Sequence, residues 1–260
     1  MTSERGIRMD RVCYTVGGRR ILKEFDLLLE RGVNRTILGK SGAGKTTILK
    51  LILGLLKPDA GAISIDGTVI GGLRESQLIP VRRNIAIVFQ GGALFDSMTV
   101  GENVGYRLFE EGKLTEDEIE RIVLEKLSFV GLEHSIDLYP AELSGGMKKR
   151  VAIARALAAE PDYIFFDEPT TGLDPIGVYN IRNLMLRLQA EGKTTLMVTH
   201  DLETAFAVSE RFSFLHETRL AFEGTEEEMK RSEIPEIREF LAPTERSLFI
   251  SNSNNTDIHP

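Results

Sequence analysis

Residues 39–46 constrain the fold of this chain more than any other segment. They spell GKSGAGKT, a glycine-rich turn that follows a short predicted strand at 35–38 and precedes a helical pattern at 46–56. Glycines let the backbone curl so that its N–H groups face a polyphosphate, and the start of the following helix adds further N–H groups and a positive dipole end. The segment therefore predicts a nucleoside-triphosphate site where a strand runs into a helix.

Each position of this turn has an expected contact with the nucleotide. The expected phosphate-binding residues are Gly39, Lys40, Ser41, Gly42, Ala43, Gly44, Lys45, Thr46 and Thr47. Lys45 would place its charge near the β- and γ-phosphates, Thr46 would offer a hydroxyl to Mg²⁺, and Thr47 would bond the α-phosphate. The turn alone does not distinguish a kinase from a GTPase or a motor.

Two acidic residues follow the apolar strand expected at 163–166. Ligands gather at the carboxyl ends of strands in sheets of this kind, so Asp167 is expected to hold Mg²⁺ opposite Thr46. Glu168 comes one residue later, so its side chain is expected to point to the opposite face of the strand. We expect Glu168 to polarise the water that attacks the γ-phosphorus. Either acid alone would be more simply explained as part of a solvated turn.

Two further polar residues end apolar stretches. His200 follows 195–199, a strand expected to lie beside the one that leads into the glycine-rich turn, and we expect it to bond the γ-phosphate. Gln90 follows 85–89, and its amide could coordinate Mg²⁺ or orient water. Taken singly, a lone histidine is more often structural and a lone glutamine more often a surface residue.

Composition limits the class of protein. The chain has 260 residues and a formal charge of −7, which argues against a general nucleic-acid partner. Its single cysteine, Cys13, excludes an internal disulfide and a four-cysteine zinc site. No run approaches the roughly 18 apolar residues of a membrane span, and the charged start lacks the apolar block of a secretory signal. We expect a soluble chain that could dock on a membrane protein.

Strand-like and helical stretches alternate, which predicts an α/β fold with a largely parallel sheet. Residues 7–16 and 62–65 predict strands of a smaller β layer near the N-terminus. Residues 91–160 are mostly helical in pattern, and Thr115 with Glu118 predicts a capping box. One folded domain is expected over 1–241 with this helical subdomain inserted, followed by a polar, flexible tail at 242–260.

Residues 143–147 read LSGGM and precede a helical pattern at 148–159. Together with the turn at 39–47, Gln90, Asp167 and Glu168, the TGLD at 171–174 and His200, this order resembles the ABC-type ATPases. The resemblance covers roughly 8–241 and implies a P-loop ATPase with a RecA-like mixed core sheet, an N-terminal antiparallel β layer and a helical subdomain. It implies that ATP and Mg²⁺ bind between two copies of the chain. The residues expected to complete the partner copy's ATP site or lie at the junction are Ser144, Gly145, Gly146 and Asp174.

Two positions depart from the pattern of that family. Met147 stands where glutamine is usual, and its thioether is a poor hydrogen-bonding group. Val16 stands where an aromatic residue commonly stacks on adenine. Tyr14 lies two residues earlier on the same strand face, and we expect it to pack in the core rather than to bind the base.

A narrower resemblance concerns the ATPases of Mla-type phospholipid transporters. It depends on residues 90–100 (QGGALFDSMTV), 102–104 (ENV), Met147 with the KKR that follows, and 235–241. It implies a membrane permease docked near 90–98, a lipid-carrying substrate-binding protein acting indirectly, and a place at the cytoplasmic face of the inner membrane. Leu94, Phe95 and Met98 would then form a groove for a permease helix, although they could simply pack in the helical subdomain.

Three other functions fit part of the sequence. An ABC importer or exporter for another substrate would keep every motif. A soluble ABC ATPase acting on ribosomes or DNA usually carries paired ATPase halves or a long coiled coil, and this chain has one set of motifs and no sustained heptads. A P-loop kinase would leave Gln90 and residues 143–147 without a role.

Overall fold

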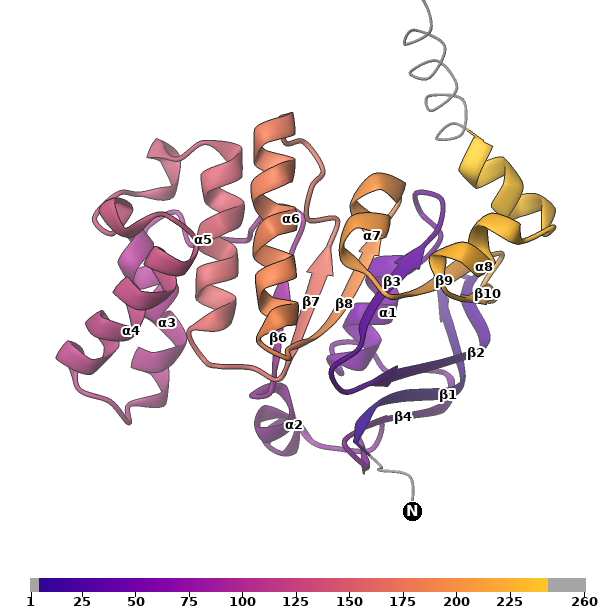
Figure 1. Ribbon diagram of the computed structural model, residues 1–260. Helices are drawn as coiled ribbons and strands as arrows, with labels where there is room; N and C mark the ends of the chain where they lie inside the picture. Colours follow the sequence, from indigo (N-terminus) through magenta and orange to yellow (C-terminus); the bar gives the residue numbers. More distant parts are fainter. Residues whose placement is uncertain (1–4, 243–260) are drawn as a thin grey trace, which may run out of the picture.

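The computed structural model describes residues 5–242 of the chain. A mixed six-stranded sheet runs through the molecule in the order β10–β9–β3–β8–β7–β6 (Figure 1). All neighbouring pairs in it are parallel except β9 with β10. Its strands are β3 (Asn34–Leu38), β6 (Ile85–Val88), β7 (Tyr163–Asp167), β8 (Thr194–Thr199), β9 (Arg211–His216) and β10 (Arg219–Gly224).

A four-stranded antiparallel sheet in the order β2–β1–β4–β5 packs on one face of the central sheet. Its strands are β1 (Gly6–Val16), β2 (Arg19–Glu30), β4 (Ala60–Ile65) and β5 (Thr68–Val69). Helix α1 (Lys45–Ile52) lies in the same layer, and its apolar side chains share a core with Phe25 of β2 and Phe165 of β7.

The other face of the central sheet is covered by helices. They are α5 (Gly145–Leu157), α6 (Pro175–Ala190), α7 (Leu202–Val208) and α8 (Glu226–Arg231), followed by a helical turn at 235–242. Phe166 of β7 and Met197 of β8 point into this second core, whereas Phe165 and Leu196 point into the first. Central strands buried on both faces explain their almost continuous apolar sequence.

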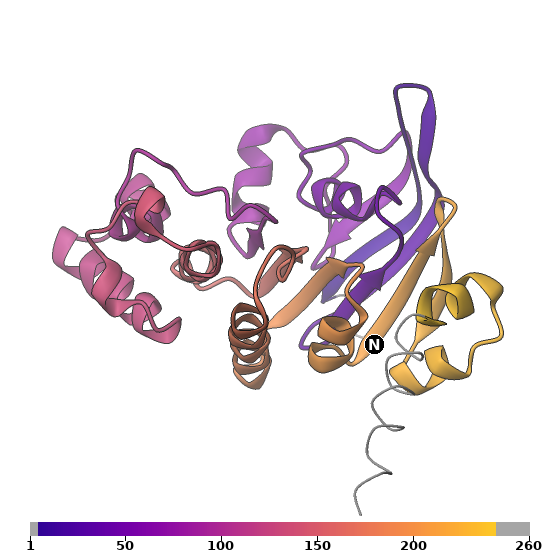
Figure 2. The same cartoon turned by 90° about the horizontal axis from the view of Figure 1, so that it is seen from above.

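The segment between β6 and β7 is mostly helical and lies at one end of the molecule (Figures 1 and 2). It contains α3 (Val100–Glu111), α4 (Glu116–Phe129), two short 3₁₀ turns (Glu133–Ser135 and Pro140–Glu142) and α5. The Thr115–Glu118 capping box starts α4, and a second box, Thr99 with Glu102, starts α3. Ile119, Val123 and Leu127 form the buried face of α4.

The fold is the expected one in class, and several boundaries differ. Helix α1 ends at Ile52, four residues before the predicted end, and Gly54 follows with a positive φ of 64° that turns the chain. Helix α5 begins at Gly145, earlier than predicted, because Ser144 caps it. Strand β2 and the β9–β10 hairpin were not predicted from the sequence. The helix α2 (Glu75–Arg82) also was not predicted.

The predicted polar tail lies outside the described residues apart from residue 242. Over residues 5–242, none of the helices combines the length and apolar character needed to cross a membrane.

A polar network ties the antiparallel sheet to the central sheet. The buried phenol of Tyr163 donates to Asp66 Oδ1 at 2.7 Å, and Arg31 Nε donates to the phenol oxygen at 3.2 Å. Asp66 also accepts a bond from the backbone N–H of Gly6 at 2.9 Å, and Arg31 reaches Asp162 at 2.9 Å. Burial and the neighbouring Asp66 raise the pKa of Tyr163 to about 12, so the phenol remains a donor at neutral pH.

We expect Tyr163→Phe to lower the free energy of unfolding by about 1–2 kcal/mol, because it leaves Asp66 short of one buried donor. Urea unfolding measures the change. Tyr179→Phe is the matched control, since that side chain is 65% exposed. Equal unfolding free energies for wild type and Tyr163→Phe would contradict this role.

Candidate active site

The glycine-rich turn joins β3 to α1 and needs glycine at two positions. A Cβ on Gly39 would lie 2.7 Å from the carbonyl oxygen of Leu215, and one on Gly44 would lie 2.6 Å from Cγ2 of Ile21. Gly44 also has a φ of 106°, which suits glycine alone, and it caps the helix that starts at Lys45. Close packing around the turn therefore holds its N–H groups at the helix start.

Lys45 lies buried beneath this turn. Its Nζ donates to the carbonyl oxygens of Gly39 at 2.7 Å and Lys40 at 3.2 Å, and lies 3.5 Å from Glu168 Oε1. Burial lowers the pKa of Lys45, and the negative charge of Glu168 opposes that shift. The ammonium is thus held against carbonyls of the turn and beside the Glu168 carboxylate.

A hollow of about 300 Å³ opens over the turn. Apart from Ile21, all its lining residues are ones expected from the sequence to bind nucleotide or Mg²⁺ or to take part in hydrolysis. Its lining residues are Ile21, Ser41, Gly42, Gly44, Lys45, Thr46, Thr47, Gln90, Glu168 and His200. Four different segments therefore bring the glycine-rich turn, Gln90, Glu168 and His200 together in one hollow.

Thr46 and Asp167 lie side by side at the edge of this hollow. The Thr46 hydroxyl donates to Asp167 Oδ1 at 2.9 Å. Burial raises the pKa of Asp167, the bond from Thr46 lowers it, and the neighbouring Glu168 raises it further, so the net direction is upward. A hydroxyl and a carboxylate oxygen are hard ligands of the kind that Mg²⁺ prefers, and a cation here would offset the charge of Asp167.

Glu168 does not continue the strand, which corrects the expected alternation. Strand β7 ends at Asp167, and Glu168 has a left-handed φ of 49°, so the turn rather than the pleat aims its side chain. Its backbone N–H donates to the Val198 carbonyl at 2.9 Å. Its carboxylate accepts bonds from Thr199 Oγ1 at 2.8 Å and pairs with His200 Nδ1 at 2.9 Å.

These contacts determine the charge state of Glu168. Burial by itself would raise the pKa of Glu168, but hydrogen bonds from His200 and Thr199 and the charge of Lys45 outweigh it and lower that pKa. The carboxylate is ionised at neutral pH. His200 is half exposed and reaches both Glu168 and the hollow, as expected for a residue that closes β8 beside β3.

Gln90 begins a loop whose shape is fixed by Asn103. No role for Asn103 was predicted from the sequence. The fully buried Asn103 amide accepts from the Phe95 N–H at 2.8 Å and donates to the carbonyls of Phe95, Met98 and Thr99. Phe95 is 41% exposed and its ring lies 4.7 Å from that of Tyr106. The loop thus presents an aromatic side chain on a rigid support.

The LSGGM segment lines a different hollow in the same chain. This hollow, of about 360 Å³, shares no residue with the one over the glycine-rich turn. Ser144, Gly145, Gly146 and Asp174 all line it. Ser144 Oγ accepts the Met147 N–H at 3.2 Å, and Asp174 Oδ1 accepts the Gly177 N–H at 2.6 Å, so both residues cap helices. Within one chain these residues do not reach the Lys45 site.

A third hollow of about 390 Å³ adjoins the glycine-rich turn and shares Ile21, Ser41 and Gly42 with the first. Its remaining wall comes from Lys40 and Ala43 of the same turn, from Arg19 and Arg20 at the start of β2, and from residues 215–218, where β9 turns into β10. Neither the start of β2 nor the β9–β10 turn was predicted from the sequence. Tyr14 is partly buried against the core, as expected, while Val16 is 54% exposed.

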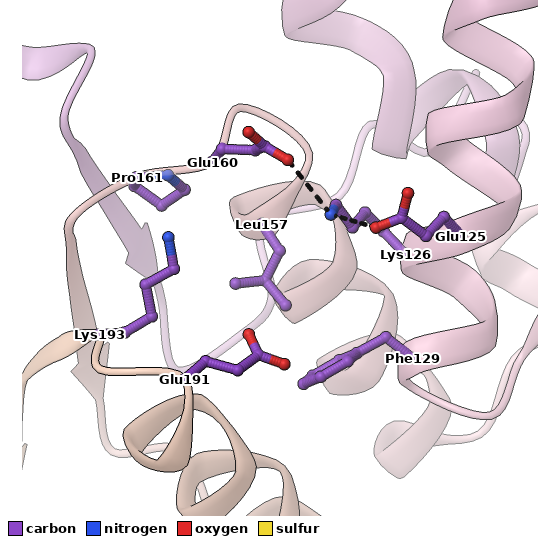
Figure 3. Close-up of a pocket in the computed structure, with 8 residues that line it drawn as sticks. All are labelled: Glu125, Lys126, Phe129, Leu157, Glu160, Pro161, Glu191 and Lys193. Carbon is purple, nitrogen blue, oxygen red and sulfur yellow. Dashed lines mark hydrogen bonds and ion pairs between the residues drawn. The ribbon is translucent and has the colours of Figure 1, made fainter.

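A fourth hollow, of about 400 Å³, lies where α4 and α5 meet the entries to β7 and β8 (Figure 3). Lys126 crosses it, pairing with Glu125 at 2.6 Å and Glu160 at 3.7 Å. None of the expected site residues lines it.

Comparison with known proteins places this geometry in a family. Residues 22–171 match the family described as ABC transporter. The chain is 39% identical over 236 residues, 90% of its length, to the Haemophilus influenzae protein named intermembrane phospholipid transport system ATP-binding protein MlaF, of which it covers 89%. It is 38% identical, again over 90% of its length, to a Mycobacterium bovis protein named probable ribonucleotide transport ATP-binding protein mkl, of which it covers 66%.

A solved structure is similar in fold as well as in sequence. It is the dimeric post-hydrolysis state of the ATP-binding cassette MJ0796 bound to ADP and Pi, with a TM-score of 0.78 and 35% identity. The match covers 84% of this chain and 98% of that one. The chain therefore belongs to the ABC transporter family and is an ATP-binding, ATP-hydrolysing subunit of that family.

Proposed function

We propose that this chain powers the movement of phospholipid between membranes as a homodimer bound to a membrane permease. The observation that carries the proposal is the convergence of Lys45, Glu168 and His200 in one hollow, in a chain 39% identical to proteins named for phospholipid transport. The dimeric form of the similar cassette supports a working dimer.

Hydrolysis is assigned to residues of that hollow. The N–H groups of the glycine-rich turn and Lys45 bind the phosphates, and Glu168 accepts a proton from the attacking water. His200 holds the Glu168 carboxylate and reaches the γ-phosphate. When the phosphates draw Lys45 away from Glu168, the carboxylate loses a stabilising charge, so its pKa rises and it becomes a better base.

Mg²⁺ would be held by Thr46 and Asp167, with Gln90 as a third oxygen donor from the facing loop. Bound there with the nucleotide, it would supply charge neutralisation for the phosphates. The distance of 2.9 Å between Thr46 Oγ1 and Asp167 Oδ1 supports the assignment, because two oxygens this close together can bind the same ion.

A second copy would complete the nucleotide site. Ser144, Gly145, Gly146 and Asp174 lie in a hollow apart from Lys45, so they can contact nucleotide only on a partner. Ser144 caps α5, whose N–H groups suit an anion. We assign these residues to the γ-phosphate held by the partner's glycine-rich turn, with Asp174 at the junction.

The permease would dock on the loop at 90–98. Asn103 holds this loop, and Phe95 presents an exposed ring there. Gln90 lies at its base inside the nucleotide hollow, so the same loop spans both sites. A lipid-carrying substrate-binding protein would act indirectly, through the permease, and this chain would lie at the cytoplasmic face of the inner membrane. The relative named for ribonucleotide transport makes ribonucleotide the competing cargo.

We expect Glu168→Gln to lower ATP turnover by at least 100-fold while leaving ATP binding within about threefold, because the amide cannot accept the proton from water. Phosphate release and equilibrium ATP binding measure the two effects. Size-exclusion chromatography with ATP should show the variant as a stable dimer. Wild-type turnover in this variant would overturn the assignment of Glu168.

We expect Phe95→Glu to abolish co-purification of the permease from native membranes, while ATP hydrolysis by the isolated chain changes less than about threefold. A charge on the exposed ring position would oppose an apolar contact. Leu186→Glu is the matched control, being 42% exposed on α6.

Mass spectrometry of the material that co-purifies with wild type tests the cargo. Phospholipid with a permease supports the proposal, whereas a permease with a ribonucleotide or another solute overturns it while leaving the ATPase assignment intact.

Co-purification of permease with Phe95→Glu would contradict the docking site.

A further inference from the structure

Helix α5 carries three cationic side chains that bind backbone carbonyls of three separate segments. Arg155 donates to the carbonyls of Gly92 and Ala93, each at 2.8 Å, in the loop that follows Gln90. Arg150 donates to the carbonyl of Val130 at 3.0 Å, at the end of α4. Lys149 turns the other way, toward the segment that follows β7. One helix thus contacts both segments that bring Gln90 and Glu168 into the nucleotide hollow.

Lys149 is the buried member of this set, and all its polar contacts are with the Glu168 turn. Its Nζ lies 2.7 Å from the carbonyl oxygens of Pro169 and Thr171 and 3.4 Å from that of Glu168. Three carbonyls of one short turn therefore converge on one ammonium, which has three protons to donate. A buried cation needs such partners, and buried carbonyls in turn need a donor.

This turn includes the backbone conformation that aims Glu168. The left-handed φ of 49° at Glu168 is unfavourable for a side-chain-bearing residue and persists only where the surroundings impose it. Thr199 and His200 hold the carboxylate itself, and the Val198 carbonyl holds the Glu168 N–H. On the carbonyl side of the turn, Lys149 supplies bonds to Glu168, Pro169 and Thr171. Without the ammonium these carbonyls would repel one another and the turn would open.

We propose that Lys149 is a positioning residue for ATP hydrolysis, which binds the carbonyls of the Glu168 turn and thereby holds the Glu168 carboxylate where it can act on water. The inference rests on the proposed role of Glu168. Lys149 touches neither the expected phosphate site nor Thr46 or Asp167, so its effect is on the turnover step rather than on ATP affinity. The same bonds join α5 to the segment that follows β7, and the second hollow is lined by residues of both, among them Ser144, which caps α5, and Gly172.

The test compares Lys149→Met with Lys149→Gln in the full-length chain. Methionine keeps the length and apolar stem but has no donor, whereas the glutamine amide can still donate to two carbonyls. Displacing a reacting group by about 1 Å can cost about 100-fold in rate. We expect Lys149→Met to lower kcat by about 10- to 100-fold with KM for ATP within about twofold. Lys149→Gln should give an intermediate kcat.

Lys148→Met is the matched control, because its side chain is only partly buried and, over residues 5–242, has no hydrogen bond or ion pair with another residue. Phosphate release gives kcat and KM, equilibrium binding gives the affinity for ATP, and thermal unfolding shows that each variant is folded. The control should keep wild-type kcat.

Each outcome decides between a positioning role and a purely structural one. Wild-type kcat in Lys149→Met, or a loss of kcat matched by an equal loss of ATP affinity, overturns the proposal. If Lys149→Met does not fold, Lys149→Gln decides: lowered kcat with unchanged KM supports the proposal, and unchanged kcat overturns it. If wild type itself releases no phosphate, the proposed ATPase function fails first, a result that differs from a failure of Lys149 alone.

Discussion

The parallel pairing of β3, β8 and β7 is the constraint on which the rest of the site depends. Its register sets Leu38 beside Thr199 and Val198 beside Asp167, so three strands end at one edge of the sheet. Each strand then continues directly into a polar group: the glycine-rich turn, Glu168 or His200. Because the strands are buried on both faces and hydrogen-bonded throughout, these groups start from rigid points, and the distances between Lys45, Glu168 and His200 follow from the sheet.

The two buried lysines near this edge, Lys45 and Lys149, are bound mostly by backbone carbonyls rather than by carboxylates. Lys45 is held by two carbonyls of its own turn and Lys149 by three carbonyls of the Glu168 turn. Carbonyls stabilise an ammonium without neutralising it, so each lysine keeps its charge. In the proposed mechanism Lys45 exchanges its contact with Glu168 for phosphate, while Lys149, held by three carbonyls, keeps the Glu168 turn in place. The two lysines therefore contact the same glutamate and have different proposed tasks. Lys45, which contacts the Glu168 carboxylate, binds phosphate, and Lys149, which contacts the Glu168 carbonyl, holds the turn.

Much of this arrangement could be predicted from local sequence. The glycine-rich turn, the acids after an apolar strand and the histidine after another each follow from a short pattern, and the expected β3–β8 neighbourhood is confirmed. The turn of Glu168 could not be predicted, since strand alternation suggested the opposite face and the left-handed φ depends on Val198 and Lys149 from distant segments. The structural roles of Asn103 and Arg155 could not be predicted for the same reason: an interior asparagine and a helical arginine have no local signature for such a role, and only their backbone partners reveal it.

The sequence by itself determined the class of fold, the glycine-rich turn between a strand and a helix, and the family, because these depend on residues close together along the chain and on their order. Only the tertiary structure decided which way Glu168 points, what shapes the loop after Gln90, and that Ser144 and Lys45 occupy separate hollows in one chain. Those features depend on contacts between segments tens of residues apart, where a side chain's role is set by the carbonyls and cavities that folding brings to it and not by its neighbours in sequence.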